Sequence, residues 1–429
     1  MADKNREILK QKLKQRVVDP RDLEEEPAGS YQGDATSGSG NPRGRKRFLI
    51  ILFAALVLAI LITGGILLTR RQFGGYDVSW TTDFAAANGT VESDYESYEP
   101  FGKGMIKVTR DGASYIDASG KTIWNQSYEM NAPYVSVNGD YCAIADQTRT
   151  TIYILSTSGL TGQAETSLPI TKVSVSSEGV VYALLEDSNA SYITVFTREG
   201  AALDITIKSV LSGDGYPVDL SVSPDGTAVI ASFAYLTNGT LNNKIIFYNL
   251  GEVGQNASTN RVVGGFTDDF AGHLTGRVHF SDNSSAQAFY DGGIAFFSTK
   301  VLTSPELIKN EAISQTIRAI AYDHDYVGLV TDNVGTDSQE PYRLMLYKTN
   351  GTKLFDKPVS FNFERFDISN GHILLYNDTS LEVYDNNGNL KYQGNLDTTI
   401  TRARVMSGGV LGLHLLVGSE GKMESVRLK

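Results

Sequence analysis

Residues 134–159 of this chain read YVSVNGDYCAIADQTRTTIYILSTSG. Two runs of alternating apolar residues flank an Asn138-Gly139 pair, and a third run follows a short polar segment. Asn-Gly favours the backbone angles of a tight turn between antiparallel strands. Because the apolar residues recur with a period of two and β-branched residues are frequent, the stretch predicts three consecutive antiparallel strands.

The same unit recurs along the chain. Further copies begin at Gly104 (a shorter one), Lys172, Asp219, Arg277, Ala319, Phe366 and Arg402. The last apolar residue of the first strand advances from Val137 to Val405 with a mean period of about 45 residues, the size of one four-stranded propeller blade. Residues 76–429 therefore predict an all-β propeller with eight blades, and seven blades is the alternative.

The final copy supplies only three strands, which would leave its blade incomplete. Residues 76–82, YDVSWTT, form a strand-like stretch with no partner nearby in the sequence. We predict that this stretch is the outer strand of the final blade, because an open propeller would expose two edge strands.

Residues 48–69, FLIILFAALVLAILITGGILLT, are 22 residues without a charge. As a helix rising ~1.5 Å per residue they would span on the order of 33 Å, enough for a hydrocarbon core of ~30 Å. A secretory signal peptide has a shorter apolar core and a small-residue cleavage site, whereas two arginines follow this run. We predict an uncleaved, single-pass transmembrane helix.

The basic residues beside this run predict its orientation. Four Lys or Arg lie within 43–47, and only two arginines follow the run. The positive-inside rule therefore predicts a cell-membrane protein with a cytoplasmic N-terminus and an extracellular C-terminal domain. The predicted parts are a basic tail with a disordered linker (1–47), the transmembrane helix (48–69) and an extracytoplasmic propeller (70–429). Small residues spaced by four within the helix also allow a homodimer through this segment.

Charge and cysteine content restrict the function of the exported part. Residues 72–429 carry 25 Lys and Arg against 41 Asp and Glu. Such an acidic surface repels nucleic acid and polyanionic polymers, so we expect no nucleic-acid partner. Cys142 is the sole cysteine, so the domain has no internal disulfide and depends on its hydrophobic core.

The turns between strands resemble those of known propeller repeats. SPDG at 223–226 and the sequences IDASGKTIW, YNLG, YKTNGTKLF and YDNNGNLKY resemble the YVTN, WD40-like and quinoprotein-like groups. The whole arrangement resembles uncharacterised membrane-anchored, extracytoplasmic propeller proteins of Gram-positive bacteria. The resemblance implies a fold and no particular activity. Only two tryptophans and no adjacent cysteine pair are present, so quinoprotein cofactor chemistry is not implied.

The sequence contains no motif for catalysis, a cofactor or a metal. G-x-S-x-G, H-E-x-x-H and the phosphate-binding loop are all absent. The Asp-Asn-Asn-Gly run at 385–388 is typical of a tight turn and lacks the rest of a calcium loop. We therefore predict no catalytic residues, no cofactor and no metal ligands, although a propeller can gather distant histidines at its axis.

The repeats are longest at 235–243 and 331–341, between second and third strands, and at 252–275, between units. In a propeller these loops emerge on the same face. They predict either a polar binding face or tolerated surface insertions. The candidate ligand-binding residues are Tyr235, Asn238, Asp332 and Asp337.

Together these features predict a non-enzymatic, membrane-anchored scaffold or sensor that binds a protein or peptide partner at the cell envelope. The alternative is an envelope hydrolase or lyase acting on a glycan or peptide at the propeller mouth. Carboxylates, histidine and arginine converging within ~3 to 5 Å at the axial mouth would favour the enzyme.

Overall fold

The computed structural model describes residues 42–84, 95–258, 260–334, 339–409 and 412–429. The chain divides into two compact units, 1–64 and 65–429. The predicted cytoplasmic tail and linker lie largely in residues 1–41, outside the described residues.

A helix, α2 (Pro42–Thr69), covers the apolar segment. Proline suits the first turn of a helix because the N–H it lacks has no partner there. Within the described residues, however, no helix combines the length and the apolar character needed to cross a membrane. The predicted transmembrane helix is therefore not supported by the structure.

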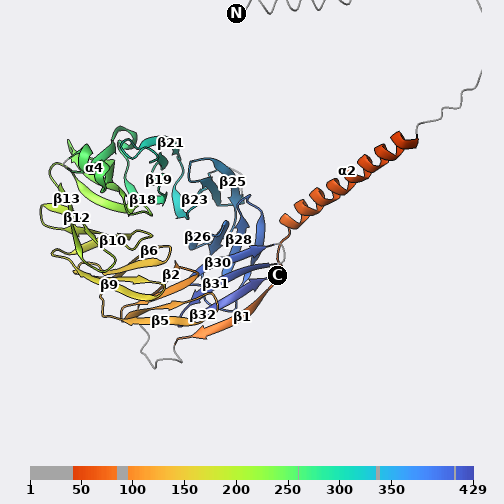
Figure 1. Ribbon diagram of the computed structural model, residues 1–429, viewed down its shortest axis with the longest axis horizontal. Helices are drawn as coiled ribbons and strands as arrows, with labels where there is room; N and C mark the ends of the chain where they lie inside the picture. The colour runs from red at the N-terminus through yellow and green to blue at the C-terminus, as the bar shows by residue number, and fades with distance from the viewer. Residues whose placement is uncertain (1–41, 85–94, 259, 335–338, 410–411) are drawn as a thin grey trace, which may run out of the picture. The chain divides into compact units, whose positions relative to one another are not determined.

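The unit 65–429 contains eight four-stranded antiparallel sheets in its described residues. Figure 1 shows them following one another around a ring, and this confirms the predicted eight-bladed all-β propeller. The first four sheets, each from the inner to the outer strand, are β2 (Glu96–Phe101), β3 (Gly104–Thr109), β4 (Gly112–Ile116), β5 (Thr122–Ser127); β6 (Pro133–Asn138), β7 (Tyr141–Asp146), β8 (Thr151–Ser156), β9 (Gly159–Glu165); β10 (Ile170–Val175), β11 (Val181–Glu186), β12 (Ala190–Phe196), β13 (Ala202–Val210); and β14 (Tyr216–Val222), β15 (Ala228–Thr237), β16 (Thr240–Asn249), β17 (Val262–Phe266).

The other four sheets complete the ring. They are β18 (Thr275–Asp282), β19 (Ser285–Tyr290), β20 (Gly293–Ser298), β21 (Glu306–Ala312); β22 (Ile317–Tyr322), β23 (Tyr326–Asp332), β24 (Tyr342–Lys348), β25 (Lys353–Val359); β26 (Arg365–Ser369), β27 (His372–Tyr376), β28 (Ser380–Asp385), β29 (Leu390–Asn395); and β30 (Arg402–Gly409), β31 (Gly412–Ser419), β32 (Lys422–Leu428), β1 (Tyr76–Asp83). A short helix, α4 (Glu252–Ala257), and a 3₁₀ turn, η1 (Asp268–Phe270), flank β17.

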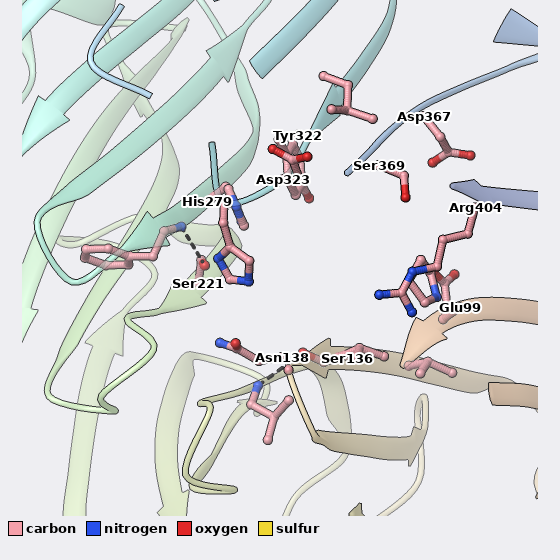
Figure 2. A pocket seen from close by; sticks show the side chains of 18 of the residues that line it. Glu99, Ser136, Asn138, Ser221, His279, Tyr322, Asp323, Asp367, Ser369 and Arg404 are labelled. Atoms are coloured by element: carbon pink, nitrogen blue, oxygen red, sulfur yellow. Dashed lines mark hydrogen bonds between the residues drawn. The ribbon is translucent and has the colours of Figure 1, made fainter. Parts of the chain in front are cut away.

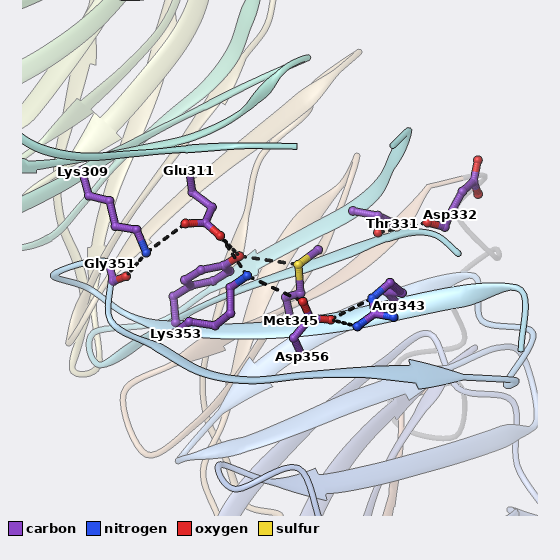
Figure 3. Close-up of polar contacts among 10 residues, drawn as sticks. Lys309, Glu311, Thr331, Asp332, Arg343, Met345, Gly351, Lys353 and Asp356 are labelled. Carbon is purple, nitrogen blue, oxygen red and sulfur yellow. Dashed lines mark hydrogen bonds and ion pairs between the residues drawn. The ribbon is translucent and has the colours of Figure 1, made fainter. Parts of the chain in front are cut away.

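The hydrophobic core lies between neighbouring blades. One buried cluster, for example, joins Ala143 and Ile154 of one blade to Val173 and Leu185 of the next. Polar contacts add to this packing on the outer strands. Glu311 of β21 forms an ion pair with Lys353 of the neighbouring β25, with the two charged atoms 2.9 Å apart (Figure 3). Each blade therefore depends on both of its neighbours for burial of its two faces.

Inner strands are linked around the axis by serine side chains. The inner edge of each blade has no strand partner, so its backbone N–H groups need other acceptors. A serine hydroxyl of one inner strand accepts the backbone N–H of the next inner strand at 3.0–3.1 Å. The pairs are Ser136 with Val175, Ser174 with Val222, and Ser221 with Phe280.

The predicted closure is confirmed. β1 pairs antiparallel with β32, from Tyr76 opposite Leu428 to Asp83 opposite Lys422, and forms the outer strand of the final blade. The Trp80 ring of β1 also lies against Gly120 of the first blade, where the Thr82 hydroxyl donates to the Gly120 carbonyl at 2.6 Å. The N-terminal strand therefore connects the last blade to the first.

Two segments that were predicted to be long loops, 235–243 and 252–275, contain regular secondary structure instead, so these two predictions are wrong. β15 and β16 continue through 235–243 to a two-residue turn, where Asn238 and Gly239 have φ angles of 52° and 78°. An Asn-Gly pair between β-branched and aromatic residues is itself a hairpin signal. The segment 252–275 contains α4, η1 and β17, and β17 is the outer strand of its blade.

We predict that Trp80→Ala lowers the free energy of unfolding by about 2 to 3 kcal/mol, because it removes packing between the last and first blades. Ile123→Ala, at an exposed side chain on β5, is the control and should cost less than about 0.5 kcal/mol. Denaturant titration of the purified full-length protein measures both. Equal costs for the two variants would contradict a role of Trp80 in ring closure.

Candidate functional site

A cavity of about 640 Å³ lies at the axis of the ring and is lined by all eight inner strands. Its wall is formed largely by the second halves of these strands and by turns that lead into the second strands, such as Asn138-Gly139 and Asp323–Asp325. The cavity therefore faces the side of the propeller that carries these turns. Figure 2 shows that its lining is rich in polar side chains.

The residues predicted to bind ligand lie elsewhere. Tyr235 and Asn238 are on the β15–β16 hairpin, and Asp332 ends β23. These connections between second and third strands leave the face opposite the cavity, because successive antiparallel strands reverse direction. Asp332 accepts two hydrogen bonds from the exposed Arg318, at 2.6 and 2.9 Å. Asp337 lies outside the described residues, and the binding role of all four stays a prediction.

Two carboxylates and an arginine converge on the cavity wall. The Arg402 guanidinium lies 2.8 Å from an Asp367 oxygen and 3.5 Å from a Glu99 oxygen. The Tyr376 hydroxyl donates to the other Asp367 oxygen at 2.5 Å. These four residues come from three neighbouring blades, and their contacts span the closure between the last blade and the first.

Burial dominates the acid-base properties of this cluster. It raises the pKa of Glu99, and Arg402 only partly opposes this effect. Burial likewise raises the pKa of Asp367, against the opposing effects of Arg402 and the Tyr376 hydroxyl. Burial alone would lower the pKa of Arg402, but the two carboxylates raise it. Glu99 keeps 33% of its side chain exposed and Asp367 only 14%, so Glu99 is the more accessible acid.

A second group lies on β18 and β22. The His279 ring stacks on the Tyr322 ring with centroids 4.0 Å apart. Its Nε2 atom is buried and has no hydrogen-bond partner in the described part of the chain. Burial, with smaller effects from His324 and Arg277, lowers the pKa of His279 to about 3. The imidazole is therefore neutral at physiological pH.

Other polar residues of the lining support the structure. Arg404 donates to the carbonyl oxygens of Gly104 and Gly102 in the first blade, at 2.6 and 3.1 Å. The Asp323 carboxylate accepts backbone N–H groups of its own turn at 2.8 and 2.9 Å. Among the described residues, no three His, Cys, Asp or Glu side chains are grouped so that they could hold a metal ion.

The sequence carried a signal for this lining that loop lengths did not reveal. In the first strand of several repeats, polar residues alternate with apolar ones. The alternating pairs are Lys172 and Ser174, Asp219 and Ser221, Arg277 and His279, and Arg402 and Arg404. Alternation on an innermost strand places one set toward the axis.

The sequence of residues 69–428 matches the model of a family of unknown function, DUF5711. The chain belongs to the DUF5711 family. None of the curated proteins matches it. The DUF5711 propeller is similar in structure to the Dos1 propeller, with 11% sequence identity, a TM-score of 0.50, and coverage of 84% of this chain and 96% of that one.

Two further solved structures show weaker similarity. BamB from Moraxella catarrhalis has 12% identity and a TM-score of 0.47, covering 82% of this chain and 100% of BamB. The Neurospora crassa Pan2 WD40 domain has 8% identity and a TM-score of 0.44, covering 83% and 97%. At these identities the comparison with Dos1 bears on the DUF5711 fold alone, and agrees with the resemblance to propeller repeats seen in the sequence.

We predict that His279 makes the DUF5711 propeller acid-sensitive. Its pKa is lowered in the folded state from an ordinary value of 6.5 to about 3, so its contribution to stability is lost as the pH falls below about 6.5. Between about pH 6.5 and 4.5 the wild type should lose on the order of 2 kcal/mol more unfolding free energy than His279→Gln. Denaturant titrations at several pH values measure this difference, and parallel curves for the two proteins would contradict it.

Proposed function

We propose that this DUF5711 protein is a non-enzymatic scaffold or sensor of the cell envelope, whose propeller binds a protein or peptide partner at the axial cavity. The observation that carries the proposal is the cavity of about 640 Å³ with charged and aromatic side chains on its wall. This volume is within the range of pockets that enclose most of a small ligand or a short peptide segment. By analogy with other propellers, such a surface suits a protein partner.

The geometry of the cavity favours binding over catalysis. Asp367 is held by Arg402 and Tyr376 together, so its oxygens are already engaged. His279 stacks on Tyr322 and contacts no carboxylate within the described residues. A nucleophile with an adjacent base, which most hydrolases need, is therefore not assembled among these groups.

One observation favours the alternative, an envelope hydrolase or lyase. The Arg402 guanidinium lies within 3.5 Å of carboxylate oxygens of both Glu99 and Asp367. A convergence of carboxylates and arginine at the axial mouth is one part of what an enzyme would need. Burial raises the pKa of Glu99, as a general acid requires. Cleavage of an envelope peptide or glycan fragment by the wild type, lost in Glu99→Gln, would support this alternative. Mass spectrometry of the products detects this cleavage.

Anchoring of the protein in the cell membrane is part of the proposal. Its support comes from the sequence of residues 48–69 and from the exposure of apolar side chains on α2, such as Phe53 and Leu61. The basic residues within 43–47 then place the N-terminus in the cytoplasm and the propeller outside. A homodimer through α2 is compatible with this arrangement.

We predict that protease added to intact protoplasts digests the propeller and spares the N-terminal tail. The physical reason is the asymmetry of basic residues around 48–69. Immunoblotting with tags at either end of the full-length protein distinguishes the fragments. Digestion of the propeller only after the membrane is permeabilised would show that the propeller lies on the cytoplasmic side.

We predict that Asn138→Trp abolishes capture of the partner, because the indole blocks the cavity at a turn that lines it. The comparison is a hairpin variant lacking Leu236, Thr237, Thr240 and Leu241. This deletion keeps the Asn238-Gly239 turn and the pairing of Ala234 with Asn243. The hairpin variant should capture the partner as the wild type does.

Crosslinking in intact membranes, purification and quantitative mass spectrometry measure this capture. Circular dichroism confirms that both variants are folded. Loss of the partner from the hairpin variant, with retention by Asn138→Trp, would move the site to the opposite face, where Tyr235, Asn238, Asp332 and Asp337 were predicted.

A further inference from the structure

Arg277 has no carboxylate within hydrogen-bonding distance among the described residues. It lies on β18, lines the cavity and keeps 41% of its side chain exposed. The nearest carboxylate among the described residues is Asp219, whose oxygen is 3.8 Å from the Arg277 Nε atom. This distance is too long for a hydrogen bond. Arg402, by comparison, lies 2.8 Å from its carboxylate.

Asp219 is already occupied by other groups. Its side chain is 1% exposed and forms an ion pair with Lys172. It also accepts the backbone N–H of Val278 at 2.8 Å. The single negative charge of Asp219 therefore serves two cations, and the Arg277 guanidinium keeps most of its hydrogen-bonding capacity.

Two tyrosines, Tyr134 and Tyr322, lie beside Arg277. Tyr134 and Tyr322 both line the cavity and both interact with the Arg277 charge. In the described part of the chain neither hydroxyl donates a hydrogen bond to a protein acceptor. His279, two residues along β18, adds the buried Nε2 atom without a partner. A guanidinium and two phenols thus line one region of the cavity, where they can donate to a group that enters it.

We infer that Arg277, Tyr134 and Tyr322 form a subsite for a carboxylate group within the axial cavity. A carboxylate presents two oxygens to the guanidinium fork and retains lone pairs for phenol donors. The inference rests on the proposed function, because it names the chemistry of the group that enters the same cavity. It predicts a ligand that carries a terminal or side-chain carboxylate.

The charges around the subsite select a monoanion. Asp219 lies within 4 Å of Arg277, and Glu99 and Asp367 are on the same cavity wall. A dianionic phosphate would be repelled by these carboxylates more strongly than a carboxylate would. The C-terminus of a peptide and the uronic acid of a glycan share the selected chemistry.

Calorimetric titration of the purified full-length protein tests this subsite with defined probes. The probes are acetyl-dialanine, its C-terminal amide, glucuronate and inorganic phosphate. At least one carboxylate probe should bind saturably, about tenfold or more tighter than the amide and phosphate. The tighter of acetyl-dialanine and glucuronate identifies the source of the carboxylate as peptide or glycan.

Three variants assign the binding to these residues. Arg277→Gln should weaken binding of the carboxylate probe about tenfold or more, and Tyr134→Phe, which keeps the ring, about threefold. Arg343→Gln is the matched control, because Arg343 pairs with Asp356 at 2.7 Å and is not among the cavity-lining residues (Figure 3). Its affinity for the probe should equal that of the wild type.

Several results would overturn the inference. These are that neither carboxylate probe binds more tightly than the amide, that phosphate binds more tightly than both, that the affinity is unchanged in Tyr134→Phe and Arg277→Gln, or that no carboxylate probe binds saturably. Partner capture that is still lost in Asn138→Trp under those results would leave the binding function intact and refute only the carboxylate subsite. The same results together with partner capture that Asn138→Trp leaves unchanged would refute both proposals.

Discussion

The structure depends on one pairing, that of β1 with β32. Because the core lies between blades, the first and last blades are buried on both faces only if the ring closes. β1 closes it by completing the last blade while Trp80 reaches the first. Other contacts across the same boundary include the hydrogen bond from the Tyr98 hydroxyl to the Ser419 carbonyl, at 2.9 Å. The two ends of the propeller sequence are thus held in one blade, and neither end can leave without exposing core.

Closure of the ring with eight blades also leaves an open, polar cavity along its axis. Side chains from eight inner strands do not fill the centre of the ring, and about 640 Å³ remains open. The inner strands therefore face a polar space, and their backbone groups bond to side chains such as Ser221 and Ser369 of the preceding blade. The same geometry brings residues far apart in the sequence, such as Glu99 and Arg402, into contact.

The sequence predicted the repeats, the number of blades and the closing strand because these follow from local alternation and from the count of strands. It did not predict the axial cavity. Loop length pointed to 235–243, but the Asn238-Gly239 turn makes that segment a hairpin on the face opposite the cavity. The contact of Glu99 with Arg402 depends on ring geometry, which no local pattern contains. The alternating polar residues of the inner strands, such as Arg277 and His279, were the available signal.

Arg402 and Arg277 illustrate how a contribution to stability and a proposed role in binding differ within one cavity wall. Arg402 is neutralised by Asp367 and lies beside Glu99 at the boundary between the last and first blades, so its charge contributes to closure. Arg277 shares Asp219 with Lys172 and keeps an exposed guanidinium. A cation that is partly removed from water without a carboxylate in hydrogen-bonding distance contributes little to folding stability. The position of Arg277 beside two phenols that donate to no protein acceptor in the described part of the chain is therefore better explained by a ligand that supplies a negative charge than by a contribution to the fold.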